Sequence, residues 1–125
     1  MQDLTQLTSA AKQVSDLYAR RFGVTRDAAW YLGKMTEELG EVTSAYLSLA
    51  GQTRKDGSKS DLENEVADLL GFLLLFADWQ GIDAGAAFER KWGAYLTEVS
   101  DGKAKRLPPC CSPDTPVQTP DERII

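Results

Sequence analysis

An apolar run near the middle of the chain, LLGFLLLFA at residues 69–77, restricts the folds available to this sequence more than any other segment. It is far shorter than the roughly 20 residues that a helix needs to cross a bilayer. Read at helical spacing, the run and its neighbours are apolar nearly all round, which is typical of a helix that other helices cover. We therefore expect it at the centre of a helical core or at a subunit interface.

Apolar residues at helical spacing predict four main helices, and no segment shows the alternation of a β-strand. A polar, glycine-bearing loop at residues 51–61 separates the second helix from the third. The predicted helices cover residues 3–22, 25–50, 61–80 and 83–100. The predicted N-cap is Thr25 for the second helix, Ser60 or Asp61 for the third, and Asp83 for the fourth.

The composition changes after the fourth predicted helix. All five prolines lie beyond Gly102, and no helical period is present there. This pattern is typical of an extended or disordered segment. The sequence therefore predicts an all-α domain over residues 1–100 and a proline-rich tail over residues 101–125.

Two pairs of acidic residues lie beside the apolar faces of the second and third helices. On a helical wheel at about 100° per residue, Glu38 borders the apolar face of the second helix and Glu41 lies about 60° further round. Glu65 and Asp68 repeat this arrangement on the third helix. If the two helices pack antiparallel through these faces, the four carboxylates converge beside the core.

Converging carboxylates require a compensating cation. Two like charges 4 Å apart repel by roughly 1 kcal/mol in water and by about 4 kcal/mol at an effective dielectric near 20. The chain contains no histidine, which excludes Ser-His and Cys-His catalytic pairs and histidine-ligated zinc. Oxygen ligands alone favour Mg²⁺, with Mn²⁺ as the second possibility.

The charge balance bears on the partners of the protein. With 14 basic and 19 acidic residues, the formal net charge is −5, so the overall field repels nucleic acid polymers and anionic membranes. A phosphorylated ligand would therefore need a cation to mediate its binding. The N-terminal sequence does not resemble a secretory signal, and we expect a cytoplasmic protein.

Part of the acidic pattern also has an ordinary explanation. Acids in the first turn of the third helix interact favourably with the helix dipole, and Lys34 can pair with Glu37 or Glu38 on the same helix. On this interpretation the acids only solubilise the protein. The chain would then be a non-enzymatic helical module that oligomerises through its third helix.

The order of these residues resembles the MazG-like superfamily of all-α nucleoside triphosphate pyrophosphatases. The motif EELGE at residues 37–41 is followed by EVAD at 65–68, an apolar run and GID at 81–83. Each half-motif alone is weak, but the two in this order are fairly specific. The likeness covers residues 28–99, and the superfamily includes dimeric dUTPases, dCTP pyrophosphatases and phosphoribosyl-ATP pyrophosphatase.

The resemblance implies a four-helix bundle that assembles as a homodimer or homotetramer. It implies Mg²⁺-dependent hydrolysis of a nucleoside or deoxynucleoside triphosphate to the monophosphate and pyrophosphate, in a role of nucleotide-pool cleaning. Phosphoribosyl-ATP hydrolysis is the main alternative within the superfamily. The base and the sugar of the substrate are not identified by the sequence.

Carried over by position, the resemblance makes Glu38, Glu41, Glu65 and Asp68 metal ligands. Glu37 is an additional acid, which would hold a further Mg²⁺ or take a proton from the attacking water. Glu41 is the other candidate for that base.

Three further residues are candidates for substrate binding. Lys91 best matches a basic residue that the superfamily places late in the fourth helix, although Arg90 and Ala94 stand where many members have Asn and Arg. Trp30 lies two turns before Glu37, where an aromatic ring can stack on a base, and core packing is the alternative. Lys34 lies close to the same acids.

Overall fold

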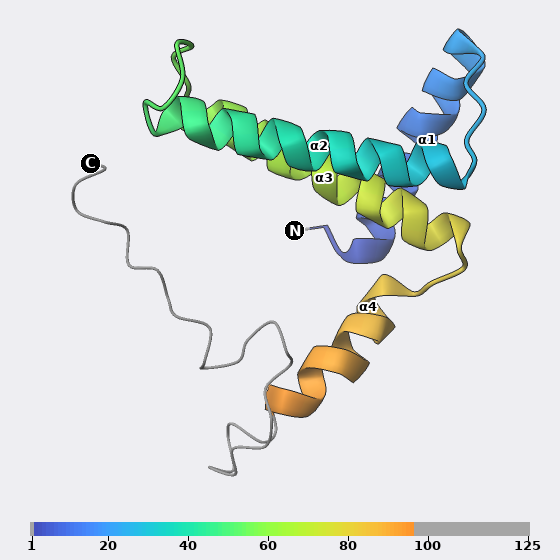
Figure 1. Cartoon of the computed structure of the whole chain (residues 1–125). Helices are drawn as coiled ribbons and strands as arrows, with labels where there is room; N and C mark the ends of the chain where they lie inside the picture. The colour runs from blue at the N-terminus through green and yellow to red at the C-terminus, as the bar shows by residue number, and fades with distance from the viewer. Residues whose placement is uncertain (1, 97–125) are drawn as a thin grey trace. The chain divides into compact units, whose positions relative to one another are not determined.

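The computed structural model describes residues 2–96, and this part of the chain is all-α (Figure 1). The chain divides into two compact units, residues 1–84 and residues 85–125. Its elements are α1 (Leu4–Phe22), α2 (Ala28–Leu49), α3 (Lys59–Trp79), α4 (Ala84–Phe88) and a π-helical turn η1 (Glu89–Gly93). The prediction of an all-α fold is confirmed.

Specific capping residues determine where α1 begins and ends. The Asp3 side chain accepts a hydrogen bond from the Gln6 backbone N–H, and Gln6 Oε1 accepts one from the Asp3 backbone N–H. A capping box therefore begins the helix. Gly23 ends it with a φ of 65°, a left-handed conformation that glycine adopts without steric cost. The predicted range of 3–22 differs from the observed helix by one residue.

The predicted caps of the next two helices are wrong. Asp27, not Thr25, caps α2 by accepting a hydrogen bond from the Trp30 N–H. Ser58 caps α3 and forms a capping box with Asp61. The sequence predicts Asp61 as a possible cap, but Asp61 occupies the third helical position, where its carboxylate accepts a hydrogen bond from the Ser58 N–H.

Helices α2 and α3 run antiparallel and lie side by side along their lengths (Figure 1). At one end Tyr31 stacks on Trp79 with ring centroids 4.7 Å apart, and Trp30 meets Phe72 edge to face at 5.7 Å. Because α1 also packs on α3, the apolar third helix lies in contact with both other long helices, which agrees with the first of the two placements that its sequence predicts. The buried hydrophobic residues of the described part are Tyr31, Leu74, Leu75 and Ala77.

Polar contacts hold α1 in place. Arg26, in the connection before α2, contacts Asp16 at 2.8 Å and donates a hydrogen bond of 2.9 Å to the buried Ser15 hydroxyl. Lys12 forms an ion pair of 3.0 Å with Asp78 of α3. Side chains of α1 are therefore tied both to the start of α2 and to the end of α3.

The second unit begins at Gly85 and contains most of α4. The helix starts directly after Asp83, as expected, and helical structure continues to residue 96, but it is not α-helical throughout. Residues 89–93 form a π-helical turn, whose hydrogen bonds span five residues instead of four. At this turn Phe88 stacks nearly parallel on Trp92, with ring centroids 5.8 Å apart. Residues 97–100 and the predicted tail at 101–125 lie outside the described residues.

No single helix within residues 2–96 is both long and apolar enough to cross a membrane. One bent pair, Lys59–Trp79 with Ala84–Leu96, meets the requirement by length and composition alone.

Candidate metal centre

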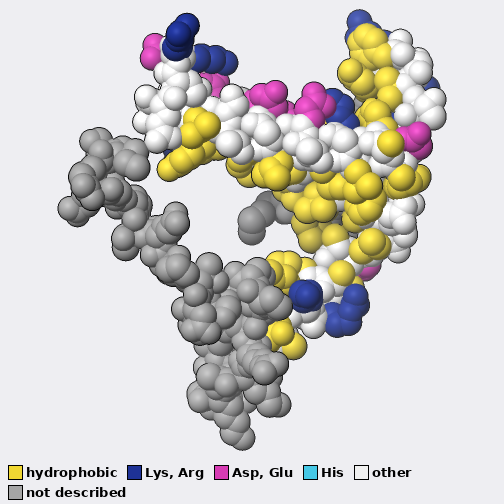
Figure 2. Space-filling view, in the orientation of Figure 1, with side chains coloured by type: hydrophobic (Ala, Val, Ile, Leu, Met, Phe, Trp, Pro, Cys, Tyr) yellow, Lys and Arg dark blue, Asp and Glu magenta, His cyan; other side chains and the backbone are white. Residues whose placement is uncertain are grey.

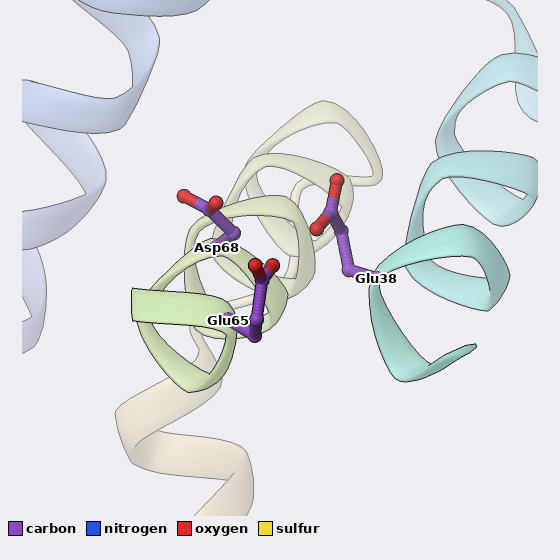
Figure 3. Close-up of side chains that lie close together, drawn as sticks. All are labelled: Glu38, Glu65 and Asp68. Carbon is purple, nitrogen blue, oxygen red and sulfur yellow. The ribbon is translucent and has the colours of Figure 1, made fainter. Parts of the chain in front are cut away.

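Three carboxylates from two helices come together beside the core (Figure 3). One oxygen from each of Glu38, Glu65 and Asp68 lies within 4.8 Å of the other two. Glu38 comes from α2, and the other two residues lie one turn apart on α3. Glu38 and Glu65 are half-buried, whereas Asp68 is exposed. We call these three residues the carboxylate group.

Antiparallel packing of α2 and α3 explains why the carboxylate group forms. Residues three apart on a helix lie on the same side, so Glu65 and Asp68 present two carboxylates toward one region. Glu38 lies at the edge of the α2 face that packs on α3, and its side chain points into the same region in Figure 3. The sequence prediction of convergence holds for these three of its four residues.

The electrostatics of Glu38 reflect this crowding. Its pKa is raised above the usual range, mainly by partial burial and then by the negative charge of Asp68, with smaller contributions from Glu37 and Glu65. The ammonium of Lys34 acts in the opposite direction. A bound cation would relieve both the desolvation and the repulsion. All three side chains offer the hard oxygen ligands that suit Mg²⁺ or Mn²⁺.

The other two acids of the EELGE motif have different surroundings. Glu41 is exposed and is not a member of the carboxylate group, because it lies further round α2 from the α3 contact. Glu37 is also exposed, and its Oε2 lies 2.7 Å from Lys34 Nζ. Their roles as fourth ligand and as proton acceptor stay predictions.

Lys34 connects the acids with an aromatic side chain. Besides its ion pair with Glu37, the Lys34 ammonium lies 5.6 Å from the centroid of the Phe72 ring, within the range of a cation–π interaction. The hydrogen bond with Glu37 is the main reason that the pKa of Lys34 is raised. Lys34 is therefore a charged cation beside Glu38, in a position to contact an anionic ligand.

A pocket of about 490 Å³ adjoins the carboxylate group. Glu38 and Asp68 form part of its wall, so the carboxylates and the pocket are continuous. The volume falls within the roughly 300–1,000 Å³ typical of small-molecule sites. The rest of the wall is mostly apolar and comes from α1, α2 and α3. It includes Ala10, Ala11, Val14, Ser15, Tyr18, Trp30, Lys34, Ala67, Gly71, Phe72 and Leu75.

The aromatic residues of the pocket were only partly predicted. Trp30, which the sequence predicts as a base-stacking residue, lines the pocket, where it also contacts Phe72. The sequence does not identify Tyr18 and Phe72 as site residues. The helical spacing places Tyr18 on the apolar side of α1, which indicates a packed side chain, but nothing in the spacing shows that α1 closes a pocket over α3.

Lys91 belongs to the second unit. It lies on η1 and is exposed, and its neighbour Trp92 is also exposed. Its assignment to substrate binding stays a prediction.

No family model matches the sequence, and neither does any curated protein or solved structure. The resemblance to the MazG-like superfamily therefore depends on the two acidic motifs and their order.

Proposed function

We propose that the protein is a metal-dependent nucleoside triphosphate pyrophosphatase, which hydrolyses its substrate to a nucleoside monophosphate and pyrophosphate. The observation that carries this proposal is the carboxylate group of Glu38, Glu65 and Asp68 at the wall of an aromatic-lined pocket. A nucleotide carries both a phosphate chain and an aromatic base, the two groups that such a site could bind. Its phosphates need a cation next to the carboxylates, and its base offers flat faces to aromatic rings.

The donor set fits Mg²⁺. Glu38, Glu65 and Asp68 would hold the ion, leaving other coordination positions for water and phosphate oxygens. When bound, Mg²⁺ polarises a phosphoryl group and neutralises the charge that develops on pyrophosphate as it leaves. The EELGE and EVAD motifs provide the same ligands in the order that the resemblance implies.

The other residues of the site have separable roles in this proposal. Trp30 and Phe72 enclose the base, and Lys34 contacts a phosphate from the side of the pocket next to Glu38. Glu37 or Glu41 accepts a proton from the water that attacks the α-phosphorus. For Glu37 this requires its ion pair with Lys34 to loosen when the substrate binds, because that contact occupies one of its oxygens.

The test is a hydrolysis assay with Mg²⁺ over a panel of ribonucleoside and deoxyribonucleoside triphosphates and phosphoribosyl-ATP. We expect pyrophosphate and the monophosphate in equal amounts. In ¹⁸O-labelled water the label should enter the monophosphate, because attack at the α-phosphorus breaks the bond to the bridging oxygen. A Glu38→Gln or Asp68→Asn change should reduce kcat by on the order of 100-fold, since several kcal/mol of charge stabilisation depend on the metal.

A matched control is Glu63→Gln. Glu63 is an exposed acid on α3, outside the carboxylate group. Its Oε1 lies 3.9 Å from Lys59 Nζ. This change alters the net charge as Glu38→Gln does, but activity should stay within about twofold because such exposed pairs contribute little. Equal losses in all three variants, or no hydrolysis of any substrate by the unmodified protein, would contradict the proposal.

A further inference from the structure

Ser15 of α1 is a polar residue that is nevertheless buried, with 8% of its surface exposed. It also lines the pocket beside the candidate metal centre. The exterior of the protein, seen in Figure 2, carries the charged side chains, whereas the pocket wall around Ser15 is mostly apolar. A buried hydroxyl in apolar surroundings is unfavourable unless it is hydrogen-bonded. The donor and the acceptor capacity of Ser15 therefore both need partners.

The hydrogen bond with Arg26 satisfies Ser15 only as an acceptor. Arg26 Nη1 donates to Ser15 Oγ at 2.9 Å. A guanidinium has N–H donors and no acceptor, so the hydroxyl hydrogen of Ser15 cannot return a bond to Arg26. Thr8, on the same helix, donates its hydroxyl hydrogen to the Leu4 carbonyl one turn earlier. Within residues 2–96 no carbonyl accepts the Ser15 hydrogen in this way, so one buried donor is left at the pocket wall.

The pocket has room for a ligand next to Ser15. Ala11 lies one turn before Ser15 on α1, and Ala67 and Gly71 lie one turn apart on α3. In the described part of the chain, no non-neighbouring atom lies within 4 Å of the place where a Gly71 Cβ would be. None of these three small side chains forms hydrogen bonds. The Ser15 hydroxyl is therefore the polar group that a ligand meets on this part of the wall.

Ser15 lies toward the opposite end of the pocket from the metal-binding carboxylates. Its partner Arg26 precedes α2, and Trp30 lies in the first turn of that helix. Glu38 lies eight residues beyond Trp30, or about 12 Å further along α2. A nucleotide with its phosphates at Glu38 and its base beside Trp30 therefore directs the far edge of the base toward Ser15.

We infer that the Ser15 hydroxyl selects the base of the substrate by donating a hydrogen bond to a carbonyl oxygen on the edge away from the sugar, and that Arg26 positions this hydroxyl. The inference rests on the proposed function in taking the ligand to be a nucleotide. The charged Arg26 donor occupies one lone pair of the hydroxyl, which makes the group a stronger donor and a weaker acceptor.

A keto base suits this donor better than an amino base does. A carbonyl oxygen projects beyond the ring and has two lone pairs, so it can reach a side chain as short as serine. An exocyclic amino group at the same place would bring two donors together. Hypoxanthine and uracil are therefore preferred over adenine and cytosine, which carry an amino group at the corresponding position.

The test compares kcat/KM for two pairs of substrates, inosine triphosphate with ATP and UTP with CTP. We expect the keto member of each pair to be favoured by at least about tenfold, because a site built around a hydrogen bond rejects an analogue that cannot form it. Ser15→Ala should bring both ratios to within about twofold of one. The change should appear mainly as a higher KM for the keto substrates, since the bond is the same in the ground state and in the transition state.

The matched control is Ser9→Ala. Ser9 is an exposed serine of α1 that lies outside the pocket, and its hydroxyl accepts a hydrogen bond from Gln13. Both ratios should stay within about twofold of their values in the unmodified protein. Unchanged ratios in Ser15→Ala, or ratios near one in the unmodified protein, would overturn the inference.

Arg26→Met tests the positioning of the hydroxyl. Arg26 is not part of the pocket wall, so its loss removes no contact with the ligand. It frees the Ser15 hydroxyl to bond the Ala11 carbonyl one turn earlier. Both ratios should fall by at least about threefold in protein that circular dichroism shows to be folded. Unchanged ratios would overturn the role of Arg26.

Binding measurements separate this inference from the proposed function. Isothermal titration calorimetry with Mg²⁺ and the α,β-methylene analogues of inosine triphosphate and ATP measures base preference without hydrolysis. Selective binding of the inosine analogue by a protein that hydrolyses neither nucleotide would support the inference and contradict the proposed function. Hydrolysis of both nucleotides at equal kcat/KM would do the reverse. Binding of neither analogue would overturn both.

Discussion

Tyr31 of α2 stacks on Trp79 of α3 with ring centroids 4.7 Å apart and ring planes at 26°. Tyr31 is buried, whereas Trp79 remains partly exposed. The contact lies near one end of the antiparallel pair, and two turns further along α2 Glu38 lies opposite Asp68. The stack therefore helps to set the register that brings the carboxylate group together.

Tyr31→Ala should lower the free energy of unfolding by about 3 kcal/mol, because it removes a buried ring and leaves a cavity. Tyr31→Phe keeps the ring and should stay within about 1 kcal/mol of the unmodified protein. Urea denaturation followed by circular dichroism measures both values. A loss of less than about 1 kcal/mol in Tyr31→Ala would show that the register is held elsewhere.

Helical spacing predicted three members of the carboxylate group because it gives the direction of each side chain around its helix. Glu38 borders the apolar face, and Glu65 and Asp68 lie on the corresponding border of α3. Direction alone does not show how far a side chain is from the neighbouring helix. Glu41, about 60° further round, lies outside the group for this reason.

Other features depend on tertiary contacts that the spacing does not contain. The path of α1 across α3 is held by Arg26 and Lys12, and their partners are not recognisable as pairs in the sequence. The pocket wall formed by Tyr18 could not be predicted without that path. The π-helical turn at Glu89–Gly93 was missed because the apolar spacing of a regular α-helix continues through it.

Glu41→Gln and Asp68→Asn should differ in their effect on metal binding, although the resemblance assigns both residues to the ligand set. Mg²⁺ should raise the melting temperature of the unmodified protein, because a ligand that binds only the folded state stabilises it. Asp68→Asn should abolish this rise, since Asp68 belongs to the carboxylate group. Glu41→Gln should retain most of it. Thermal denaturation with and without Mg²⁺ makes the comparison, and equal loss in both variants would place Glu41 among the ligands.

Arg26→Met should destabilise the protein by about 2 kcal/mol, because it removes an ion pair with Asp16 and leaves the buried Ser15 hydroxyl without its donor. Lys12→Met is the matched control, since it removes the more exposed ion pair with Asp78 and should destabilise the protein less than Arg26→Met does. Chemical denaturation at low ionic strength gives both values. The reverse ranking would mean that the end of α3, and not the start of α2, anchors α1.

Lys34→Gln should change metal binding and nucleotide binding in opposite directions. Removing a positive charge beside Glu38 reduces repulsion of Mg²⁺, so affinity for the ion alone should increase by a few-fold. Removing a phosphate contact should weaken binding of a non-hydrolysable triphosphate by about tenfold, or roughly 1.4 kcal/mol. Isothermal titration calorimetry measures the two affinities separately. Equal changes in the two affinities would indicate that Lys34 acts only structurally, through its ion pair with Glu37.

The capping box of α3 should make stability depend on pH through Asp61. The Ser58 side chain and then its backbone N–H hold the pKa of Asp61 below its usual range. An acid whose pKa is lower in the folded state stabilises the protein above its unfolded pKa, near 3.8, and this contribution is lost as the pH falls through the lower folded value. Ser58→Ala should cost about 1 kcal/mol at pH 7 by removal of the cap. It should also lose less stability than the unmodified protein between pH 5 and pH 3, an interval of roughly one unit on each side of that unfolded pKa. Urea denaturation at both pH values, with EDTA to exclude metal, tests this, and an identical pH dependence in the two proteins would contradict it.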